Sequence, residues 1–202
     1  MIRIGLTGSL AAGKSTVGRM FERWGARRID ADQLAREAVA PGTAGLTAIR
    51  EEWGDAVLDE RGSLDRDAMR RIIFADESER ARLEAIVHSE VRRLRSDRTA
   101  TAEREGALVI VHDVPLLFES GLESDCDTIV VVDAPVSVRR DRARRTRGWS
   151  DEEFESIERT QLSPAEKRAR ADHLIENDGT WAELERKARG VWGELLSGTE
   201  AG

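Results

Sequence analysis

The sequence has no tyrosine, a single cysteine and few aromatic residues of any kind, and each shortage excludes a class of protein. The lone thiol, Cys126, cannot form an internal disulfide and has no metal-cluster spacing around it, so we expect it to pack as a small hydrophobe. Aromatic residues make up 4% of the 202 residues, too few for the stacking platforms that bind single-stranded nucleic acid. The net charge of −7 also opposes general binding to a phosphate backbone.

Long apolar runs are missing as well. No window reaches the length of a membrane span, and the first expected strand begins at Ile2, which leaves no room for a secretory signal. We therefore expect a soluble, cytoplasmic protein without a membrane partner. No repeat or low-complexity tract interrupts the chain, and its length fits one α/β domain with a substantial core.

Short runs of β-branched and aliphatic residues predict the strands. The first, third and fourth runs are nearly continuous in Ile, Val and Leu, which is typical of parallel strands covered by helices on both faces. The long interval between the second and third runs carries apolar helical faces and predicts a helical insertion. Later helix starts show capping patterns at Ser150, Ser163 and Thr180. The expected strands are 2–6, 26–30, 108–111, 128–132 and 173–175.

One motif is complete. The segment GSLAAGKST fits G-x-x-x-x-G-K-[ST], and it follows a strand pattern and precedes a helix pattern, as phosphate binding requires. Gly8 and Gly13 permit the dihedrals that turn backbone N–H groups toward phosphates, and the helix N-terminus adds partial positive charge. Lys14 is expected to reach the β- and γ-phosphates, and the Ser15 hydroxyl to bind Mg²⁺. The expected nucleotide-binding loop comprises Gly8, Ser9, Leu10, Ala11, Ala12, Gly13, Lys14, Ser15 and Thr16.

Two acidic residues follow expected strands at the edge where an open parallel sheet gathers its ligands. Asp32 can act as a general base if the phosphate acceptor is an alcohol, or it can cap a helix that begins at Gln33. Asp30, nearer the strand, is expected to orient the turn. Asp113 ends an apolar strand, where it can hold Mg²⁺ or its waters or serve as a buried structural aspartate.

The chain after the fourth expected strand is strongly basic and then acidic, a composition suited to a segment that opens and closes over phosphates. Pro135 predicts a helix start, and from that helix Arg142 can return toward the phosphates, where a cation stabilises the transferring group. Most of its basic neighbours are expected on the surface, because charged residues are rarely buried. These neighbours are Arg139, Arg140, Arg144, Arg145 and Arg147.

Four segments in this order, IGLTGSLAAGKST, IDADQLAREAV, DVPLLFE and ADHLIENDG, resemble the dephospho-coenzyme A kinase family over nearly the whole chain. The resemblance implies a three-layer P-loop kinase fold over residues 1–202, with a five-stranded parallel sheet, a helical substrate-binding insertion and a lid. It also implies transfer of the γ-phosphate of ATP to the ribose 3′-hydroxyl of dephospho-coenzyme A, the last step of coenzyme A biosynthesis, with Mg²⁺ as cofactor. The implied parts are a core of about 1–35, 105–138 and 170–202, an insertion of about 36–104 and a lid of about 139–169.

Site roles follow by position in the same motifs. The resemblance makes Asp32 the general base, Lys14 the phosphate ligand and Arg142 the arginine near the adenine and phosphates. Asn177 is implied to close on the adenine, and Gln161 matches a lid-helix glutamine of the family. Substrate contacts are expected from Asp32, Leu116, Glu119 and His88, and metal ligands from Ser15 and Asp113.

The sequence departs from the family pattern at two places. His88 is followed by Ser89 instead of proline, so the helix there is expected to run on, and core packing is the alternative to a substrate role for His88. Ser9 and Ala11 replace glycines of many such loops, which predicts tighter dihedral limits without loss of the site.

Two other functions compete with this interpretation. A kinase of another small acceptor, such as a nucleoside monophosphate, would keep the reaction type and change the acceptor pocket. A switch GTPase would require D-x-x-G after a strand and a guanine motif, but DERG at 59–62 follows no strand pattern and no guanine motif is present. The expected partners are ATP and dephospho-coenzyme A, without nucleic acid or membrane, and the expected state is a monomer or weak oligomer.

Overall fold

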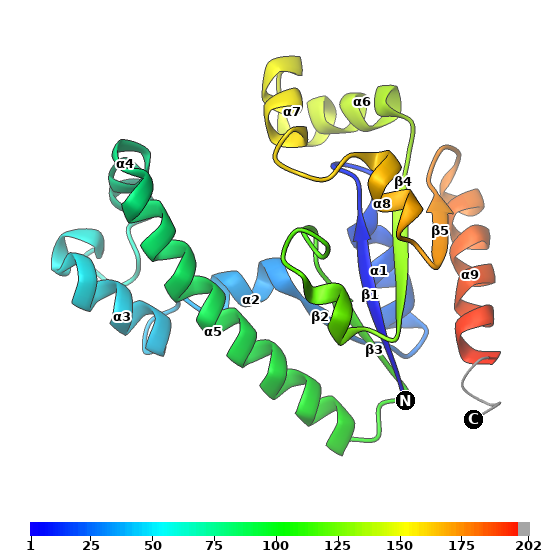
Figure 1. The fold of residues 1–202 in the computed structure, drawn as a ribbon, viewed down its shortest axis with the longest axis horizontal. Coiled ribbons are helices and arrows are strands. Elements are labelled where there is room, and N and C mark those ends of the chain that lie inside the picture. Colours follow the sequence, from blue (N-terminus) through cyan, green and yellow to red (C-terminus); the bar gives the residue numbers. More distant parts are fainter. Residues whose placement is uncertain (198–202) are drawn as a thin grey trace. The chain divides into compact units, whose positions relative to one another are not determined.

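A computed structural model describes residues 1–197, in which the strands are separated by single helices or by groups of helices (Figure 1). The chain divides into two compact units. The first unit consists of Met1–Ile29 and the chain from Ala102 onward, and the second unit is Asp30–Thr101. Residues 198–202 of the expected core segment lie outside the described residues.

The first unit is built on a five-stranded sheet in the order β2-β3-β1-β4-β5. β1 pairs in parallel with both β3 and β4, and β4 pairs in parallel with β5. The register places Leu6 opposite Asp113 on one side and Val130 on the other. All five expected strands are confirmed, with small shifts at their ends. The strands are β1 (Ile2–Gly8), β2 (Arg27–Asp30), β3 (Val109–Asp113), β4 (Thr128–Asp133) and β5 (His173–Glu176).

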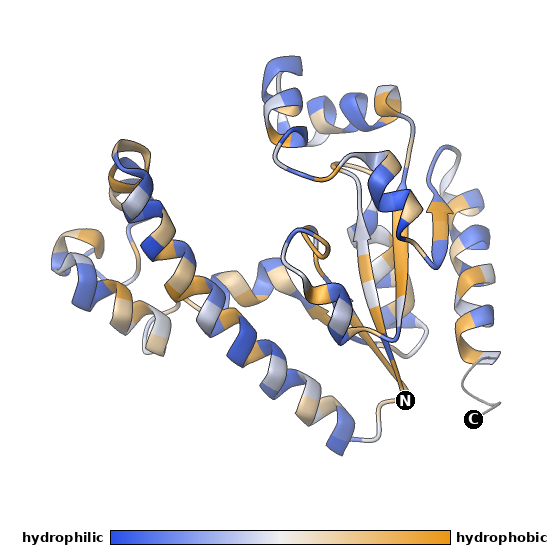
Figure 2. Cartoon of the chain, in the orientation of Figure 1, coloured by the Kyte–Doolittle hydropathy of each residue, from blue (hydrophilic) through white to orange (hydrophobic). Residues whose placement is uncertain are grey.

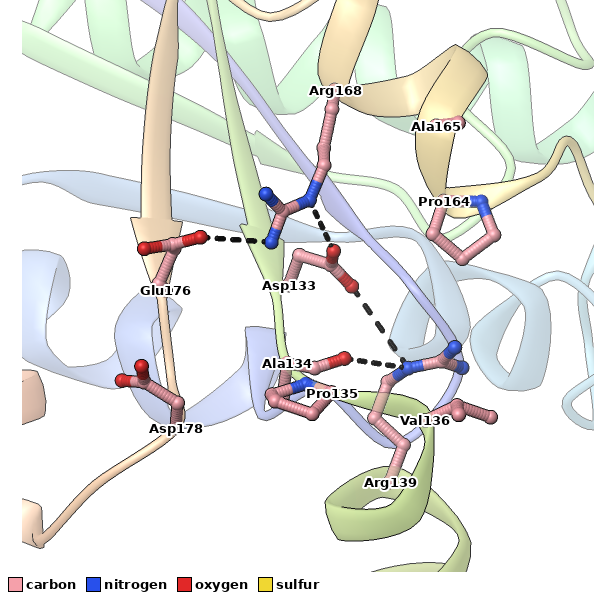
Figure 3. Close-up of a pocket in the computed structure, with 10 residues that line it drawn as sticks. All are labelled: Asp133, Ala134, Pro135, Val136, Arg139, Pro164, Ala165, Arg168, Glu176 and Asp178. Atoms are coloured by element: carbon pink, nitrogen blue, oxygen red, sulfur yellow. Dashed lines mark hydrogen bonds and ion pairs between the residues drawn. The ribbon is translucent and has the colours of Figure 1, made fainter.

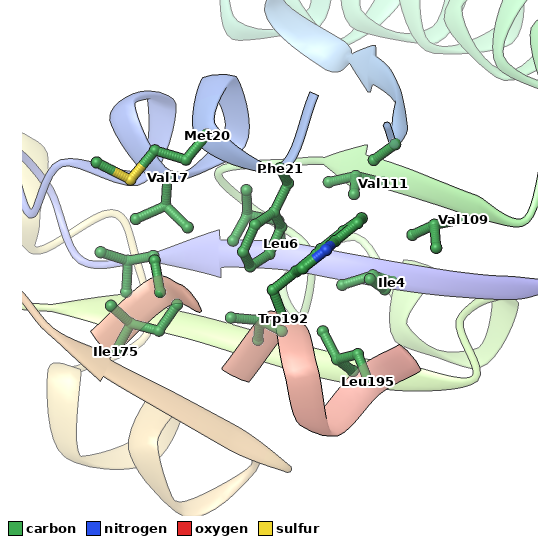
Figure 4. Packing of buried hydrophobic residues seen from close by; sticks show 14 of the residues in the cluster. Ile4, Leu6, Val17, Met20, Phe21, Val109, Val111, Ile175, Trp192 and Leu195 are labelled. Atoms are coloured by element: carbon green, nitrogen blue, oxygen red, sulfur yellow. The ribbon is translucent and has the colours of Figure 1, made fainter. Parts of the chain in front are cut away.

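Helices α1 (Lys14–Arg23) and α9 (Trp181–Ser197) pack against each other and against the sheet. Their aromatic side chains meet, with the ring centroids of Phe21 and Trp192 5.2 Å apart over the aliphatic residues of β1 and β3 (Figure 4). β4 is apolar along most of its length, whereas α1 and α9 present apolar residues on one side only (Figure 2). The predicted amphipathic helix after the phosphate loop is therefore confirmed.

Three helices connect β4 to β5: α6 (Val136–Arg147), α7 (Asp151–Glu158) and α8 (Pro164–Ala169). The predicted capping boxes begin α7 at Ser150 and α8 at Ser163, and Thr180 exchanges the same pair of bonds with Glu183 before α9. Phe154 of α7 is buried against Leu10 of the phosphate loop. A 3₁₀ turn at Leu122–Asp125 precedes β4.

The second unit is helical, as the interval between β2 and β3 predicted. It has its own core around Ile49, Val57 and Met69. The long helix α5 passes His88 and Ser89 without a break, which confirms that the helix runs on where the family pattern has proline. Its helices are α2 (Ala31–Glu37), α3 (Ala44–Trp53), α4 (Arg66–Ala75) and α5 (Glu77–Arg104, whose last residues belong to the first unit), with a 3₁₀ turn at Asp55–Val57.

Across the helices of residues 1–197, none combines the length and the apolarity that crossing a membrane demands.

Candidate active site

The phosphate loop joins β1 to α1, and its two motif glycines stand where a side chain has no room. A Cβ at Gly8 would collide with the carbonyl oxygen of Val132, and one at Gly13 would collide with Nδ2 of Asn177. Gly13 also has φ 99°, in the left-handed region, and caps the N-terminus of α1. The loop therefore brings bare backbone and a helix N-terminus to one place, which suits an anionic ligand.

Ala11 has φ 58°, which makes it the only non-glycine residue with a positive φ among residues 1–197. The tighter dihedral limits expected of this loop therefore fall on Ala11, because a Cβ costs about 1–2 kcal/mol in the left-handed region. We expect Ala11→Gly to raise the free energy of unfolding by up to about 1 kcal/mol in urea denaturation. The matched control, Ala12→Gly, removes a buried methyl group without relieving a positive φ and should lower it by about 1 kcal/mol. A lower stability of Ala11→Gly than of the wild type would contradict the strain.

Lys14 lies at the first position of α1 and forms an ion pair with Oδ1 of Asp113 at the end of β3. The other oxygen of this fully buried carboxylate accepts from Arg28, at 2.8 Å from Nε and 2.5 Å from Nη2. Gly18 leaves room for that guanidinium, since a Cβ there would lie 2.7 Å from the Arg28 Nε. Two cations thus neutralise one buried carboxylate, and the phosphates of a nucleotide would compete with Asp113 for Lys14.

The residues expected to hold Mg²⁺ supply oxygen donors, the type that this ion prefers. Ser15 is exposed in the first turn of α1, and its hydroxyl has no hydrogen bond to any residue of the described chain. Asp113 is the last residue of β3, and its two carboxylate oxygens accept from Lys14 and Arg28. Residues 1–197 hold no group of three or more His, Cys, Asp or Glu side chains that could bind a metal ion.

Arg142 on α6 and Asn177, directly after β5, both hydrogen-bond to the phosphate loop. Arg142 donates to the Ala12 carbonyl at 3.3 Å and to the backbone and side-chain oxygens of Asn177 at 3.0 and 3.1 Å, and Asn177 Nδ2 donates to the same Ala12 carbonyl at 2.8 Å. Burial, and then the charge of Arg145, lowers the pKa of Arg142. No carboxylate in the described chain pairs with Arg142, so its positive charge stays uncompensated beside the loop. Such a charge favours an anion there.

Arg139 is an exception among the basic residues that we expected on the surface, because it is buried. It donates to the carbonyls of Ala134 and Leu10 and forms a 2.6 Å ion pair with Glu158, and it thereby connects the end of β4, the phosphate loop and α7. The sequence offered no sign of this, since Arg139 and its exposed neighbours look alike in a run of arginines.

A pocket of about 350 Å³ opens between the end of β4, the start of α6, α8 and β5 (Figure 3). Asp133 lines this pocket, and Arg168 donates to its Oδ2 at 2.6 Å and to Glu176 at 2.9 Å. Burial disfavours the charged form of Asp133, but the neighbouring Ser9 and Arg168 side chains outweigh it and hold the pKa below its ordinary value. The pocket is therefore lined by compensated charges.

In the second unit, Asp30 caps α2, and its Oδ1 accepts from the backbone N–H groups of Asp32 at 2.9 Å and Gln33 at 3.1 Å. The alternative that Asp32 caps a helix starting at Gln33 is wrong, because α2 begins at Ala31 and the residue whose side chain caps it is Asp30. The turn-orienting role expected of Asp30 is confirmed. Asp32 is exposed in the first turn, and its carboxylate has no partner among residues 1–197.

The remaining expected substrate residues have different environments. Leu116 is 42% exposed in the turn after β3. Glu119, in the same turn, accepts from the backbone N–H of Leu162 at 2.8 Å and lies 3.2 Å from Lys167. His88 is exposed on α5, so the core-packing alternative for it is wrong. Cys126, expected as a buried hydrophobe, is half-buried and donates weakly to the Leu122 carbonyl at 3.6 Å.

A parallel sheet with β1 at its centre, a phosphate loop that leads into α1, and the cations Lys14 on α1 and Arg142 on α6 beside that loop define a P-loop kinase fold. The sequence profile of the dephospho-CoA kinase family matches residues 2–183. The chain therefore belongs to the dephospho-CoA kinase family.

Relatives and solved structures agree with this assignment. The dephospho-CoA kinase of Thermobifida fusca is 44% identical over 96% of both chains, and that of Geobacter sulfurreducens is 47% identical over 94% of this chain and 96% of its own. The crystal structure of TT1252 from Thermus thermophilus has a TM-score of 0.81 at 37% identity and covers 96% of this chain and 97% of its own. Dephospho-CoA kinase from Campylobacter jejuni, at 24% identity and a TM-score of 0.73 over 97% of this chain and 98% of its own, shares the fold.

Proposed function

We propose that this protein is a dephospho-CoA kinase that transfers the γ-phosphate of ATP to the ribose 3′-hydroxyl of dephospho-coenzyme A, the last step of coenzyme A biosynthesis. The observation that carries the proposal is a complete phosphate loop in a chain of this family, with Arg142 hydrogen-bonded to the loop and its positive charge not paired with a carboxylate of the described chain. The proposed enzyme works in the cytoplasm as a monomer or weak oligomer, with no nucleic acid or membrane partner.

On the nucleotide side, the backbone of the loop and the N-terminus of α1 surround the phosphates of ATP. Lys14 moves from Asp113 to the β- and γ-phosphates, and Arg142 supplies a second cation as negative charge shifts toward the leaving oxygen. Asn177 keeps the Ala12 carbonyl in place and contributes to the adenine side of the site.

Ser15, with Asp113 behind it, would hold Mg²⁺, which when bound neutralises the phosphate oxygens. Arg28 remains on Asp113 after Lys14 leaves, so the buried carboxylate keeps a cationic partner throughout the reaction.

On the acceptor side, Asp32 takes the proton of the ribose 3′-hydroxyl as the new O–P bond forms. Its exposure and the absence of a partner for its carboxylate among residues 1–197 support this role, because no ion pair competes for the base. Leu116, Glu119 and His88 are the further proposed contacts with dephospho-coenzyme A.

An assay that couples ADP release to NADH oxidation tests the proposal with ATP and one of three acceptors: dephospho-coenzyme A, adenosine monophosphate or water. We expect sustained turnover with dephospho-coenzyme A alone, and mass spectrometry of the product should show one added phosphate. Turnover with adenosine monophosphate in its place would instead identify a nucleoside monophosphate kinase. When GTP replaces ATP in the same assay, a strong preference for GTP without need of an acceptor would identify a switch protein.

A further inference from the structure

Lys167 on α8 is a charged side chain with no exposed surface, although lysine is rarely buried. Its Nζ lies 3.2 Å from the Pro115 carbonyl oxygen, 3.2 Å from Glu119 Oε1 and 3.3 Å from Gln161 Oε1. An ammonium group has three N–H donors, so these oxygens satisfy it completely. The reaction proposed above gives this buried charge no part.

Two of the three oxygens belong to one turn, residues 115–119, which we call the acceptor turn. The Thr7 hydroxyl of β1 donates to the Pro115 carbonyl at 3.0 Å, and the Leu162 N–H donates to Glu119. The acceptor turn is thus bound to the sheet by Thr7, to α8 by Lys167, and to the chain between α7 and α8 by the Leu162 N–H.

We propose that Lys167 is a positioning residue for acceptor binding: it holds the acceptor turn, with its exposed Leu116, in the conformation that receives dephospho-coenzyme A. The inference rests on the proposed function, which makes this turn a substrate contact. Lys167 does not touch the phosphates itself, because its side chain is buried and all three N–H donors are engaged.

Stability alone does not account for a charge in this place. Replacing the whole Lys167–Glu119 pair by apolar side chains of similar volume would avoid the cost of removing the charges from water, and such replacements of a buried pair are often neutral or stabilising. What an apolar side chain cannot do is fix three oxygens from two segments at defined positions. The ammonium therefore specifies the geometry of the acceptor turn.

The test compares Lys167→Met with the wild type in KM for dephospho-coenzyme A, kcat, and the Kd of a fluorescent ATP analogue measured without acceptor. We expect the KM for dephospho-coenzyme A to rise about tenfold while the nucleotide Kd changes by less than about twofold. Lys167→Arg keeps a cation, so its KM for dephospho-coenzyme A should rise less than that of Lys167→Met. The matched control is Lys187→Met, because Lys187 binds Glu176 and Asp178 and not the acceptor turn. This control should leave the KM for dephospho-coenzyme A unchanged.

A merely structural role makes a different prediction. It would lower kcat in step with a lower folded fraction by thermal denaturation and leave the KM for dephospho-coenzyme A and the nucleotide Kd unchanged, and this result would overturn the proposal. Should Lys167→Met not fold, Thr7→Val removes the other donor to the Pro115 carbonyl at nearly constant shape. It should raise the KM for dephospho-coenzyme A by about threefold at constant nucleotide Kd, and an unchanged KM would refute the role of the turn. A wild-type enzyme that phosphorylates no dephospho-coenzyme A refutes the proposed function itself, a separate outcome.

Discussion

Replacing Asp32 with asparagine is expected to lower kcat for dephospho-coenzyme A phosphorylation by about 10²- to 10⁴-fold, the usual contribution of a general base. Asparagine keeps the size of the side chain and removes its capacity to accept a proton. The fold should not change, because α2 is capped by Asp30, and Asp32 contributes only its backbone N–H to that cap. Steady-state rates at saturating ATP and acceptor measure the effect.

Two controls separate chemistry from binding and folding. The Kd of a fluorescent ATP analogue and the midpoint of thermal unfolding should match those of the wild type in Asp32→Asn. Asp30→Asn is the matched variant on the neighbouring acid, and it should keep most of the activity because asparagine caps helices as well as aspartate does. Unchanged kcat in Asp32→Asn would remove the base from the mechanism.

The strands could be predicted because their signal is local. An almost unbroken apolar run such as 128–132 has few alternatives to a buried parallel strand, and the structure has β4 there. The helix starts at Ser150 and Ser163 could be predicted for the same reason, since a capping box is complete within four consecutive residues. The phosphate loop could also be predicted from a local signal, because its glycines are required by backbone dihedrals at their own positions.

The partners of charged side chains could not be predicted, because they depend on which distant segments the fold brings together. Lys167 reads as a solvated residue of a basic helix, yet its three oxygens come from the acceptor turn and from Gln161. Arg28 gives no sequence sign that it will pair with Asp113, the last residue of another strand. The choice between Asp30 and Asp32 as helix cap depended on a start that differs by two residues, which is within the uncertainty of any boundary assigned from sequence.

Gly13→Ala is expected to have the second large effect, on both stability and nucleotide binding. The backbone at Gly13 has φ 99°, which a residue with a Cβ adopts at a cost of about 1–3 kcal/mol. The added Cβ would also collide with Nδ2 of Asn177, so the loop or the asparagine must move. We expect a lower free energy of unfolding in urea, by about 1–3 kcal/mol, and a loss of ATP-analogue binding by fluorescence titration.

The two causes can be separated by a double-variant cycle. Asn177→Ala alone removes the 2.8 Å hydrogen bond to the Ala12 carbonyl and should cost about 0.5–1.5 kcal/mol of stability. In that background the collision is absent while the positive φ remains, so Gly13→Ala should cost less than in the wild type, with a coupling energy of about 0.5–3 kcal/mol. Strictly additive costs would mean that only the backbone dihedral forbids a side chain at Gly13. A double variant less destabilised than the sum of the two single variants would show that the contact between Gly13 and Asn177 also excludes a side chain there.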